Sequence, residues 1–175
     1  MEHPDHVNLI QKAVPTGGIW ADLGSGRGAF TLALADCLGG GTSHIYSIDT
    51  DQRALKMQET RMHAEYPHQP VSYIEADFTQ PLDLPPLDGI LMANSLHFVR
   101  DKQAVVEQIR HYLKPDGRLV LVEYNTNQGN YAVPYPMTFD VWKALSEQWG
   151  FRQTDLIATR PSRFLGAFFA SVSYR

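Results

Sequence analysis

The sequence predicts an α/β fold in which helices cover both faces of a doubly wound sheet. Short apolar segments alternate with longer amphipathic ones along its 175 residues. The short segments are continuously apolar, which is typical of strands that are buried on both faces of a mostly parallel sheet. With 43% hydrophobic and 19% charged residues, the chain has enough apolar material for a buried core. We therefore expect residues 1–175 to form a single domain.

The expected strands are short and end at Gly, Asp or Asn. The first five cover residues 19–23, 45–48, 71–74, 89–93 and 119–122. Residues 78–88 contain three prolines, so we expect this crossover to be an extended loop. The last two strands, 151–159 and 167–174, are joined by Pro161-Ser162-Arg163 and are predicted to form an antiparallel hairpin.

Five amphipathic segments predict the helices, and most begin at a side chain that can accept hydrogen bonds from free backbone amides. Asp5, Asp51, Asp101 and Thr138 are the expected caps, and the remaining helix, from Phe30 to Leu38, follows a glycine-rich turn. The first helix carries Val7, Ile10 and Val14 on one face. The fourth should extend to Leu113 and close at Pro115-Asp116-Gly117, and the fifth should bury Val141, Trp142, Leu145 and Trp149.

The glycine-rich turn follows the first strand and reads Asp22-Leu23-Gly24-Ser25-Gly26-Arg27-Gly28. Glycines there let a ligand approach the backbone, and the following helix offers unpaired amides. Asp49 ends the second strand, where a carboxylate can accept hydrogen bonds from ribose hydroxyls. A nicotinamide dinucleotide site normally has the spacing G-x-G-x-x-G, whereas this loop has G-x-G-x-G. The carboxylate of Asp22 would also repel the pyrophosphate of a dinucleotide, but it would attract an amino group. The loop favours a zwitterionic nucleoside ligand.

This turn resembles motif I of the class I S-adenosylmethionine-dependent methyltransferases. Further agreement lies in Asp49, Ala76-Asp77-Phe78, Asp88-Gly89-Ile90 and residues 113–119, so the resemblance covers residues 15–124. It implies a seven-stranded sheet of order 3-2-1-4-5-7-6 whose last strand is antiparallel. It also implies S-adenosyl-L-methionine as cofactor, bound by Asp22, Gly24, Ser25, Gly26, Asp49, Thr50, Asp77, Phe78 and Asn94.

The resemblance also implies a role for several of these residues. Asp22 would lie near the amino group of the cofactor, and Asp49 would hold its ribose hydroxyls. Asp77 and the backbone amide of Phe78 would contact the adenine, while Asn94 would approach the methionine moiety. No Asn-Pro-Pro-Tyr motif is present, which disfavours methylation of an exocyclic nitrogen in nucleic acid.

Candidate catalytic residues follow the fourth and fifth expected strands. His97 is the first candidate base, because its ordinary pKa suits proton removal near neutrality. Glu123 is the second candidate, and Tyr135 lies with Tyr131 in a loop at 125–137 that is expected to wall the acceptor pocket. Each candidate has an alternative: His97 could be a structural histidine, Glu123 a surface carboxylate, and the loop at 125–137 a solvated spacer. The first helix and the loop near His97 are expected to complete the pocket.

Composition argues against several other functions. The balance of 15 Lys+Arg against 19 Asp+Glu gives a net charge of -4 without a basic run, so no nucleic-acid partner is expected. No apolar run is long enough for a membrane helix, and the polar N-terminus is unlike a signal peptide, which favours a cytoplasmic protein. The single cysteine, Cys37, and the scattered histidines predict no metal site.

We therefore predict an enzyme that transfers a methyl group from S-adenosylmethionine to a small-molecule acceptor. Two alternatives remain open: a non-catalytic methyltransferase-like binding module, and a nucleotide-dependent oxidoreductase. Homodimer formation is also left open.

Overall fold

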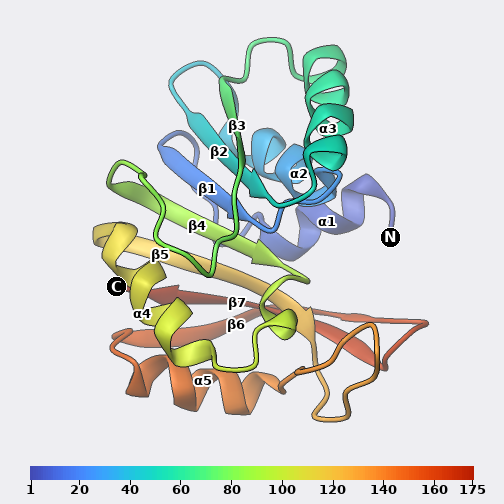
Figure 1. Ribbon diagram of the computed structural model, residues 1–175, viewed down its shortest axis with the longest axis vertical. Coiled ribbons are helices and arrows are strands. Elements are labelled where there is room, and N and C mark those ends of the chain that lie inside the picture. Colours follow the sequence, from blue (N-terminus) through green and yellow to red (C-terminus); the bar gives the residue numbers. More distant parts are fainter.

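The computed structural model describes residues 1–175 and contains a seven-stranded sheet flanked by helices (Figure 1). In chain order the elements are α1 (His3–Ile10), β1 (Ile19–Leu23), α2 (Ala29–Leu38), β2 (His44–Asp49), α3 (Gln52–Glu65), β3 (Val71–Glu75), β4 (Leu87–Ala93), the 3-10 helix η1 (Leu96–Phe98), α4 (Lys102–Tyr112), β5 (Leu113–Tyr124), α5 (Phe139–Gln148), β6 (Gln153–Pro161) and β7 (Ala167–Tyr174).

The strands lie in the order β3-β2-β1-β4-β5-β7-β6, which confirms the predicted topology. β7 runs antiparallel to both of its neighbours, whereas the pairs among β1 to β5 are parallel. The chain passes from β1 to β2 on one side and later returns to β4 on the other. This reversal is a topological switch point, and open α/β sheets bind ligands beyond the carboxyl ends of their strands at such a point.

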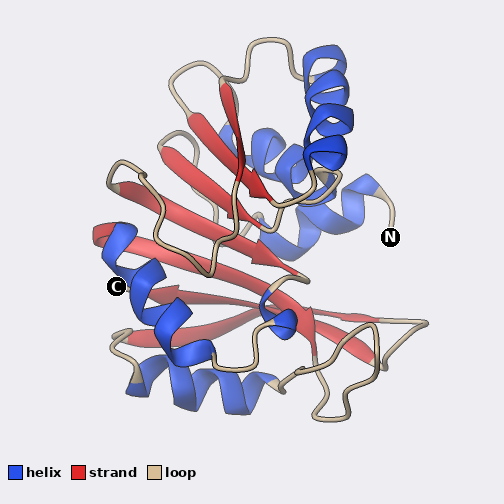
Figure 2. Cartoon of the chain, viewed as in Figure 1, coloured by secondary structure: helices blue, strands red, loops and turns tan.

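Helices cover both faces of the sheet, as Figure 2 shows. Alternate residues of β5 explain the two cores, because Val120 and Val122 pack on one face and Leu119 and Leu121 on the other. α1, α2 and Met62 of α3 belong to the first core. α4 and Trp142 of α5 belong to the second. None of the helices combines the length and the hydropathy that crossing a membrane requires.

The expected extended crossover and terminal hairpin are both confirmed, since no helix lies between β3 and β4 and β6 pairs with β7. Four helix details were wrong. Asp101 is at the N-cap position of α4, but its side chain accepts no hydrogen bond from a backbone amide. α1 begins at His3 with Glu2 as its cap, and the Asp5 carboxylate accepts a hydrogen bond from the Glu2 backbone amide at 3.0 Å. The same helix ends at Ile10, so Val14 is buried outside it. In α5, Val141 is exposed to solvent.

The end of α4 also differs from the prediction. Leu113 begins β5 by pairing with Leu87 of β4, and the register shifts before Gly89 pairs with Arg118. The extra residues, Pro115-Asp116-Gly117 among them, therefore lie within the irregular start of the strand and do not form a turn after the helix. Proline is tolerated there because an irregular stretch does not need every ladder hydrogen bond.

Candidate active site

The glycine loop between β1 and α2 has a backbone that favours glycine. Gly24, Gly26 and Gly28 have φ angles of 75°, 53° and 80°. A Cβ added to Gly24 would lie 2.5 Å from the Ser95 Cβ, and one added to Gly28 would lie 2.4 Å from the Gln58 Cγ. A Cβ on Gly26 would meet nothing within 4 Å. Gly24 and Gly28 are thus required by packing, whereas Gly26 faces open space that a ligand can use.

Asp49 joins the end of β2 to this loop. Its Oδ2 accepts a hydrogen bond from the Gly26 backbone amide at 2.7 Å, and its Oδ1 accepts one from the Asp51 amide at 2.9 Å. Each carboxylate oxygen has a second lone pair, so Asp49 can still accept hydrogen bonds from a ligand.

A cavity of about 380 Å³ lies above the carboxyl ends of the central strands; we call it the glycine-loop cavity. Six of the nine residues predicted to bind cofactor line it: Gly24, Asp49, Thr50, Asp77, Phe78 and Asn94. Ser95 and Phe98, on the segment after β4, complete the wall beside Asn94. The structure therefore brings most of the predicted cofactor residues together around one cavity.

The other three predicted residues, Asp22, Ser25 and Gly26, do not line this cavity. The buried Asp22 accepts a hydrogen bond from the Thr31 hydroxyl at 2.6 Å. Burial raises the pKa of Asp22 to about 7; the Thr31 bond opposes this shift and the charge of Asp49 adds to it. The Ser25 hydroxyl accepts a hydrogen bond from Ser47 at 2.7 Å. Asp22 and Ser25 thus brace the loop from within the protein.

Asn94 stands out among the cavity residues. It is the only residue other than glycine with a positive φ, 56°, and its buried Oδ1 has no hydrogen-bond partner. Sparsely populated backbone angles and unpaired buried polar atoms both cost free energy, and they are concentrated at functional sites. Asn94 also lines a second cavity, so it lies where the two cavities adjoin.

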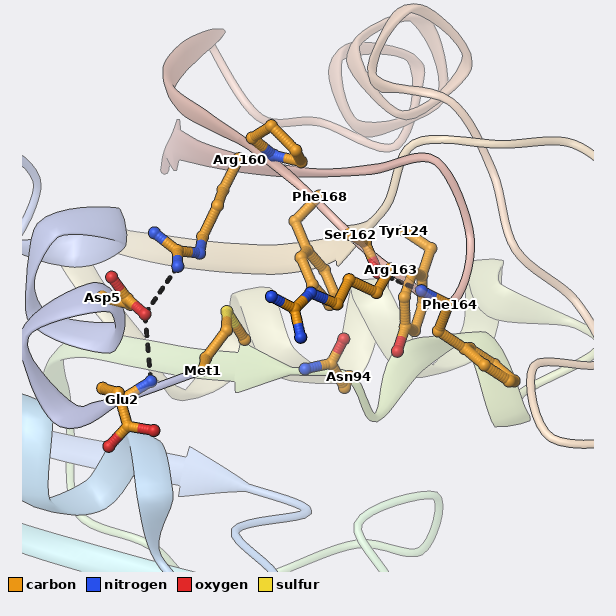
Figure 3. Close-up of a pocket in the computed structure, with 11 residues that line it drawn as sticks. Met1, Glu2, Asp5, Asn94, Tyr124, Arg160, Ser162, Arg163, Phe164 and Phe168 are labelled. Atoms are coloured by element: carbon orange, nitrogen blue, oxygen red, sulfur yellow. Dashed lines mark hydrogen bonds and ion pairs between the residues drawn. The ribbon is translucent and has the colours of Figure 1, made fainter.

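The second cavity has a volume of about 540 Å³ and is shown in Figure 3; we call it the hairpin cavity. Its wall combines the start of α1, the end of β5 and the turn between β6 and β7. The aromatic ring of Tyr124 lies 4.4 Å from that of Phe168 and 6.0 Å from that of Phe164, centroid to centroid. Arg160 pairs with Asp5 at 2.7 Å.

The sequence analysis missed the hairpin residues Arg160, Arg163, Phe164 and Phe168 as site residues. A signal was available in the predicted strand order. With only the last strand antiparallel, β6 runs in the same direction as β5, so the turn after β6 lies at the sheet edge that carries the glycine loop. Figure 1 shows this turn on the same side as the end of β4.

His97 and Glu123, predicted as separate candidates, are brought together. The His97 Nδ1 lies 2.6 Å from the Glu123 Oε2, and the His97 backbone amide donates to Oε1 at 3.1 Å. Only 3% of His97 and 1% of Glu123 are exposed. Because a carboxylate accepts hydrogen bonds, Nδ1 carries the proton, and Nε2 of a neutral ring is left as an acceptor.

The His97 ring does not line either cavity. It packs near two aromatic residues that do, with centroid distances of 4.3 Å to Phe98, which lines the glycine-loop cavity, and 6.1 Å to Tyr124, which lines the hairpin cavity. The pair therefore sits behind the junction of the two cavities.

The loop with Tyr131 and Tyr135 does not form the wall that the sequence predicted. Tyr131 is 96% exposed and Tyr135 42% exposed, and neither lines the two cavities. Tyr135 contacts His97 through the backbone, because its amide donates to the His97 carbonyl at 3.0 Å. Its own carbonyl accepts a hydrogen bond from Lys102 Nζ at 2.9 Å. These short polar contacts hold the loop while its rings face solvent.

A doubly wound sheet with a glycine loop, a carboxylate at the end of β2 and a cavity lined by both is the arrangement of Rossmann-like proteins. No group of three or more His, Cys, Asp or Glu side chains gathers to hold a metal ion. Residues 21–119 match the family model described as "Methyltransferase domain", and the chain belongs to this methyltransferase family.

Known relatives agree with this family. The chain is 29% identical over 113 residues to a 2-phytyl-1,4-naphtoquinone methyltransferase of Trichormus variabilis, covering 62% of this chain and 48% of the relative. It is 30% identical over 129 residues to a ubiquinone biosynthesis O-methyltransferase of Xylella fastidiosa, covering 70% and 49%. The chain thus spans about half the length of these relatives.

A solved structure shares the fold. It is a 1,6-didemethyltoxoflavin-N1-methyltransferase of Burkholderia thailandensis, solved with 1,6-didemethyltoxoflavin and S-adenosylhomocysteine. The TM-score is 0.74 at 16% identity, and the match covers 98% of this chain and 77% of that one.

Proposed function

We propose that this chain binds S-adenosylmethionine and transfers its methyl group to a small-molecule acceptor, with residues 1–175 acting as one domain. Asp49 carries the proposal, because its carboxylate is suited to a ribose, lines the glycine-loop cavity and accepts a hydrogen bond from the Gly26 amide beside open space. Family membership and a structural neighbour solved with S-adenosylhomocysteine support it.

The residues around the cavity fit such a cofactor. Asp77 uses Oδ1 to accept both hydrogen bonds from Thr79, at 2.9 and 2.7 Å, which leaves Oδ2 for the amino group of adenine. The unpaired Oδ1 of Asn94 can accept a hydrogen bond from the amino-acid part of the cofactor. Asp49 would hold the ribose hydroxyls, with Thr50 and Phe78 on the wall beside it.

Asp22 would act on the cofactor through charge and without direct contact. Its carboxylate lies beneath the loop, and a buried carboxylate with a raised pKa is stabilised in its ionised form by a nearby positive charge. The α-amino group of the cofactor would supply that charge. Ser25 and Gly26 would shape the loop under it.

S-adenosylmethionine, when bound, supplies an electrophilic methyl group on a sulfonium centre. The chain must then align the acceptor, exclude water and remove a proton from a hydroxyl or amine acceptor. For proton removal we propose Nε2 of His97, which would have to reach the acceptor through a bridging water or a movement of Phe98 or Tyr124, because its buried ring lines neither cavity. Glu123 would position the ring and stabilise its protonated form. Tyr135 touches His97 only through the backbone, so we assign it no catalytic role.

His97 has a competing role. Because its ring is buried behind Phe98 and Tyr124, the pair with Glu123 also fixes the segment that carries Asn94 and Ser95. A positioning role would require the hydrogen bond to Glu123 and not a free Nε2, so the two roles can be separated by substitution.

Calorimetry with S-adenosylmethionine, S-adenosylhomocysteine and NAD tests the cofactor. We expect both adenosyl ligands to bind and NAD not to bind. Binding of NAD alone would favour the oxidoreductase alternative. A turnover assay over a panel of small acceptors then separates an enzyme from a non-catalytic binding module, because the module would bind cofactor and produce no S-adenosylhomocysteine.

A further inference from the structure

The hairpin cavity holds a guanidinium group without a partner. Arg163 lies in the turn between β6 and β7, and Figure 3 shows its side chain directed across the cavity toward Met1 and Asn94. The structure shows no ion pair or hydrogen bond to this guanidinium. Arginine is charged at all physiological pH values, and its planar donors match a carboxylate in a two-point contact.

The other charged groups of the cavity leave this charge uncompensated. They are Glu2, Asp5, Arg160 and the positively charged α-amino group of Met1, which cannot neutralise an arginine. Asp5 and Arg160 neutralise each other at 2.7 Å, and the same Asp5 oxygen also accepts a hydrogen bond from the Glu2 amide at 3.0 Å. The Glu2 carboxylate is directed away from Arg163 in Figure 3. An anionic group entering the cavity would therefore meet Arg163.

The opposite part of the wall is aromatic. Tyr124 lies between Phe164 and Phe168, with the tilted and edge-on ring arrangements that aromatic groups prefer. More than half of Phe164 remains exposed, so part of its ring is free to cover a ligand. The volume of about 540 Å³ is within the range of small-molecule sites, roughly 300–1,000 Å³.

The position of the cavity relates it to the cofactor. Asn94 lines both cavities, so a compound in the hairpin cavity would lie next to the methionine end of a cofactor in the other. We propose that the hairpin cavity is the acceptor site and that it takes a planar aromatic acid, with the ring against Tyr124, Phe164 and Phe168 and the carboxylate paired with Arg163. This inference rests on the proposed methyltransferase function.

The test compares two probes that differ only in charge, 3,4-dihydroxybenzoate and its neutral amide 3,4-dihydroxybenzamide. Binding is measured by calorimetry with and without saturating S-adenosylhomocysteine. We expect the acid to bind about tenfold or more tightly than the amide, because a carboxylate paired with a guanidinium forms charge-assisted hydrogen bonds that are stronger than neutral ones. In Arg163→Gln the two probes should bind within about twofold of each other, while the affinity for S-adenosylhomocysteine stays unchanged.

Arg152→Gln is the matched control. Arg152 is exposed and lies outside the cavity, and its substitution removes the same charge. The Arg152→Gln variant should therefore keep the preference for the acid. Equal binding of both probes to the unmodified protein would overturn the proposal. A preference that survives in Arg163→Gln, or is lost equally in Arg152→Gln, would also overturn it. If S-adenosylhomocysteine fails to bind while the preference for the acid depends on Arg163, the cofactor proposal fails and the anion site stands.

Discussion

One carboxylate, that of Glu123, binds both the ring and the backbone amide of His97. The first bond fixes which ring nitrogen carries the proton, and the second fixes the segment from which the ring projects. Because both residues are buried, the geometry of each depends on the other.

His97→Asn separates the two roles proposed for this residue. The asparagine amide can replace Nδ1–H as donor to Glu123 but provides no counterpart of Nε2. If His97 is the base, this variant should lose roughly 10²–10⁴-fold in turnover, the usual size of general acid–base catalysis, with little change in cofactor affinity. The measurements are methylation rate with a productive acceptor and calorimetry with S-adenosylhomocysteine.

His97→Ala provides the comparison, because it removes both the donor and Nε2. Near-normal turnover in His97→Asn with loss in His97→Ala would establish positioning in place of proton transfer. Loss of both turnover and cofactor binding in His97→Asn would contradict the assignment of a base.

Glu123→Ala should destabilise the protein by about 2–6 kcal/mol, because it leaves Nδ1–H and the backbone amide of His97 buried without an acceptor, at about 1–3 kcal/mol each. The free energy of unfolding, measured with denaturant, checks this. Glu65→Ala removes a carboxylate whose ion pair with Arg61 is exposed, and should cost much less. Similar costs for the two variants would show that the buried pair adds nothing special to stability.

Asp49→Ala should weaken binding of S-adenosylhomocysteine by roughly 1.5–3 kcal/mol, the scale for hydrogen bonds to a charged group. Asp51→Ala is the control, since the Asp51 carboxylate accepts hydrogen bonds from the amides of Arg53 and Ala54 at the start of α3. Loss of this cap should cost about 1 kcal/mol of stability but little cofactor affinity. Unchanged affinity in a folded Asp49→Ala protein would remove Asp49 from the site.

Gly26→Val should abolish most cofactor binding, because the branched side chain would occupy the open space above the loop. Gly40→Val is a close match: Gly40 also has a positive φ, 72°, and open space around it. Backbone strain should lower the stability of both variants by about 1–3 kcal/mol. Only Gly26→Val should lose affinity for S-adenosylhomocysteine in calorimetry; equal affinities would place the cofactor elsewhere.

Asp22 should make stability depend on pH. Folding raises its pKa from 3.8 to about 7, so the folded state holds a proton that the unfolded state has released between these values. The contribution of Asp22 to stability is therefore full below pH 3.8 and is lost as the pH rises through about 7. Unfolding of the unmodified protein and of Asp22→Asn at pH 5 and pH 8 checks this. The unmodified protein should lose stability relative to the variant at the higher pH, and a constant difference would contradict the shift.

The sheet order could be predicted because the glycine loop and the strand-end acids are short local patterns that show a resemblance to a family, and that resemblance implies the order. The start of β5 could not be predicted, because Pro115-Asp116-Gly117 has the composition of a turn. Only the pairing of Leu113 with Leu87 makes this segment part of an irregular strand. The features of the site that could not be predicted depend on contacts between residues that are far apart in the sequence. His97 follows β4 and Glu123 lies near the end of the neighbouring β5, and nothing in the sequence indicates that the two side chains pair.

The two cavities draw on different parts of the chain. Every residue that lines the glycine-loop cavity falls within the segment 21–119 matched by the family model. The hairpin cavity shares only Asn94 with that segment and takes the rest of its wall from the two ends of the sequence and from Tyr124. If the hairpin cavity takes the acceptor as proposed, acceptor selectivity and cofactor use can change independently of each other. Because the ladder between β6 and β7 sets the register of the hairpin, exchanging its tip for that of a relative would then redirect the proposed methyl transfer to another acceptor while the glycine loop stays intact.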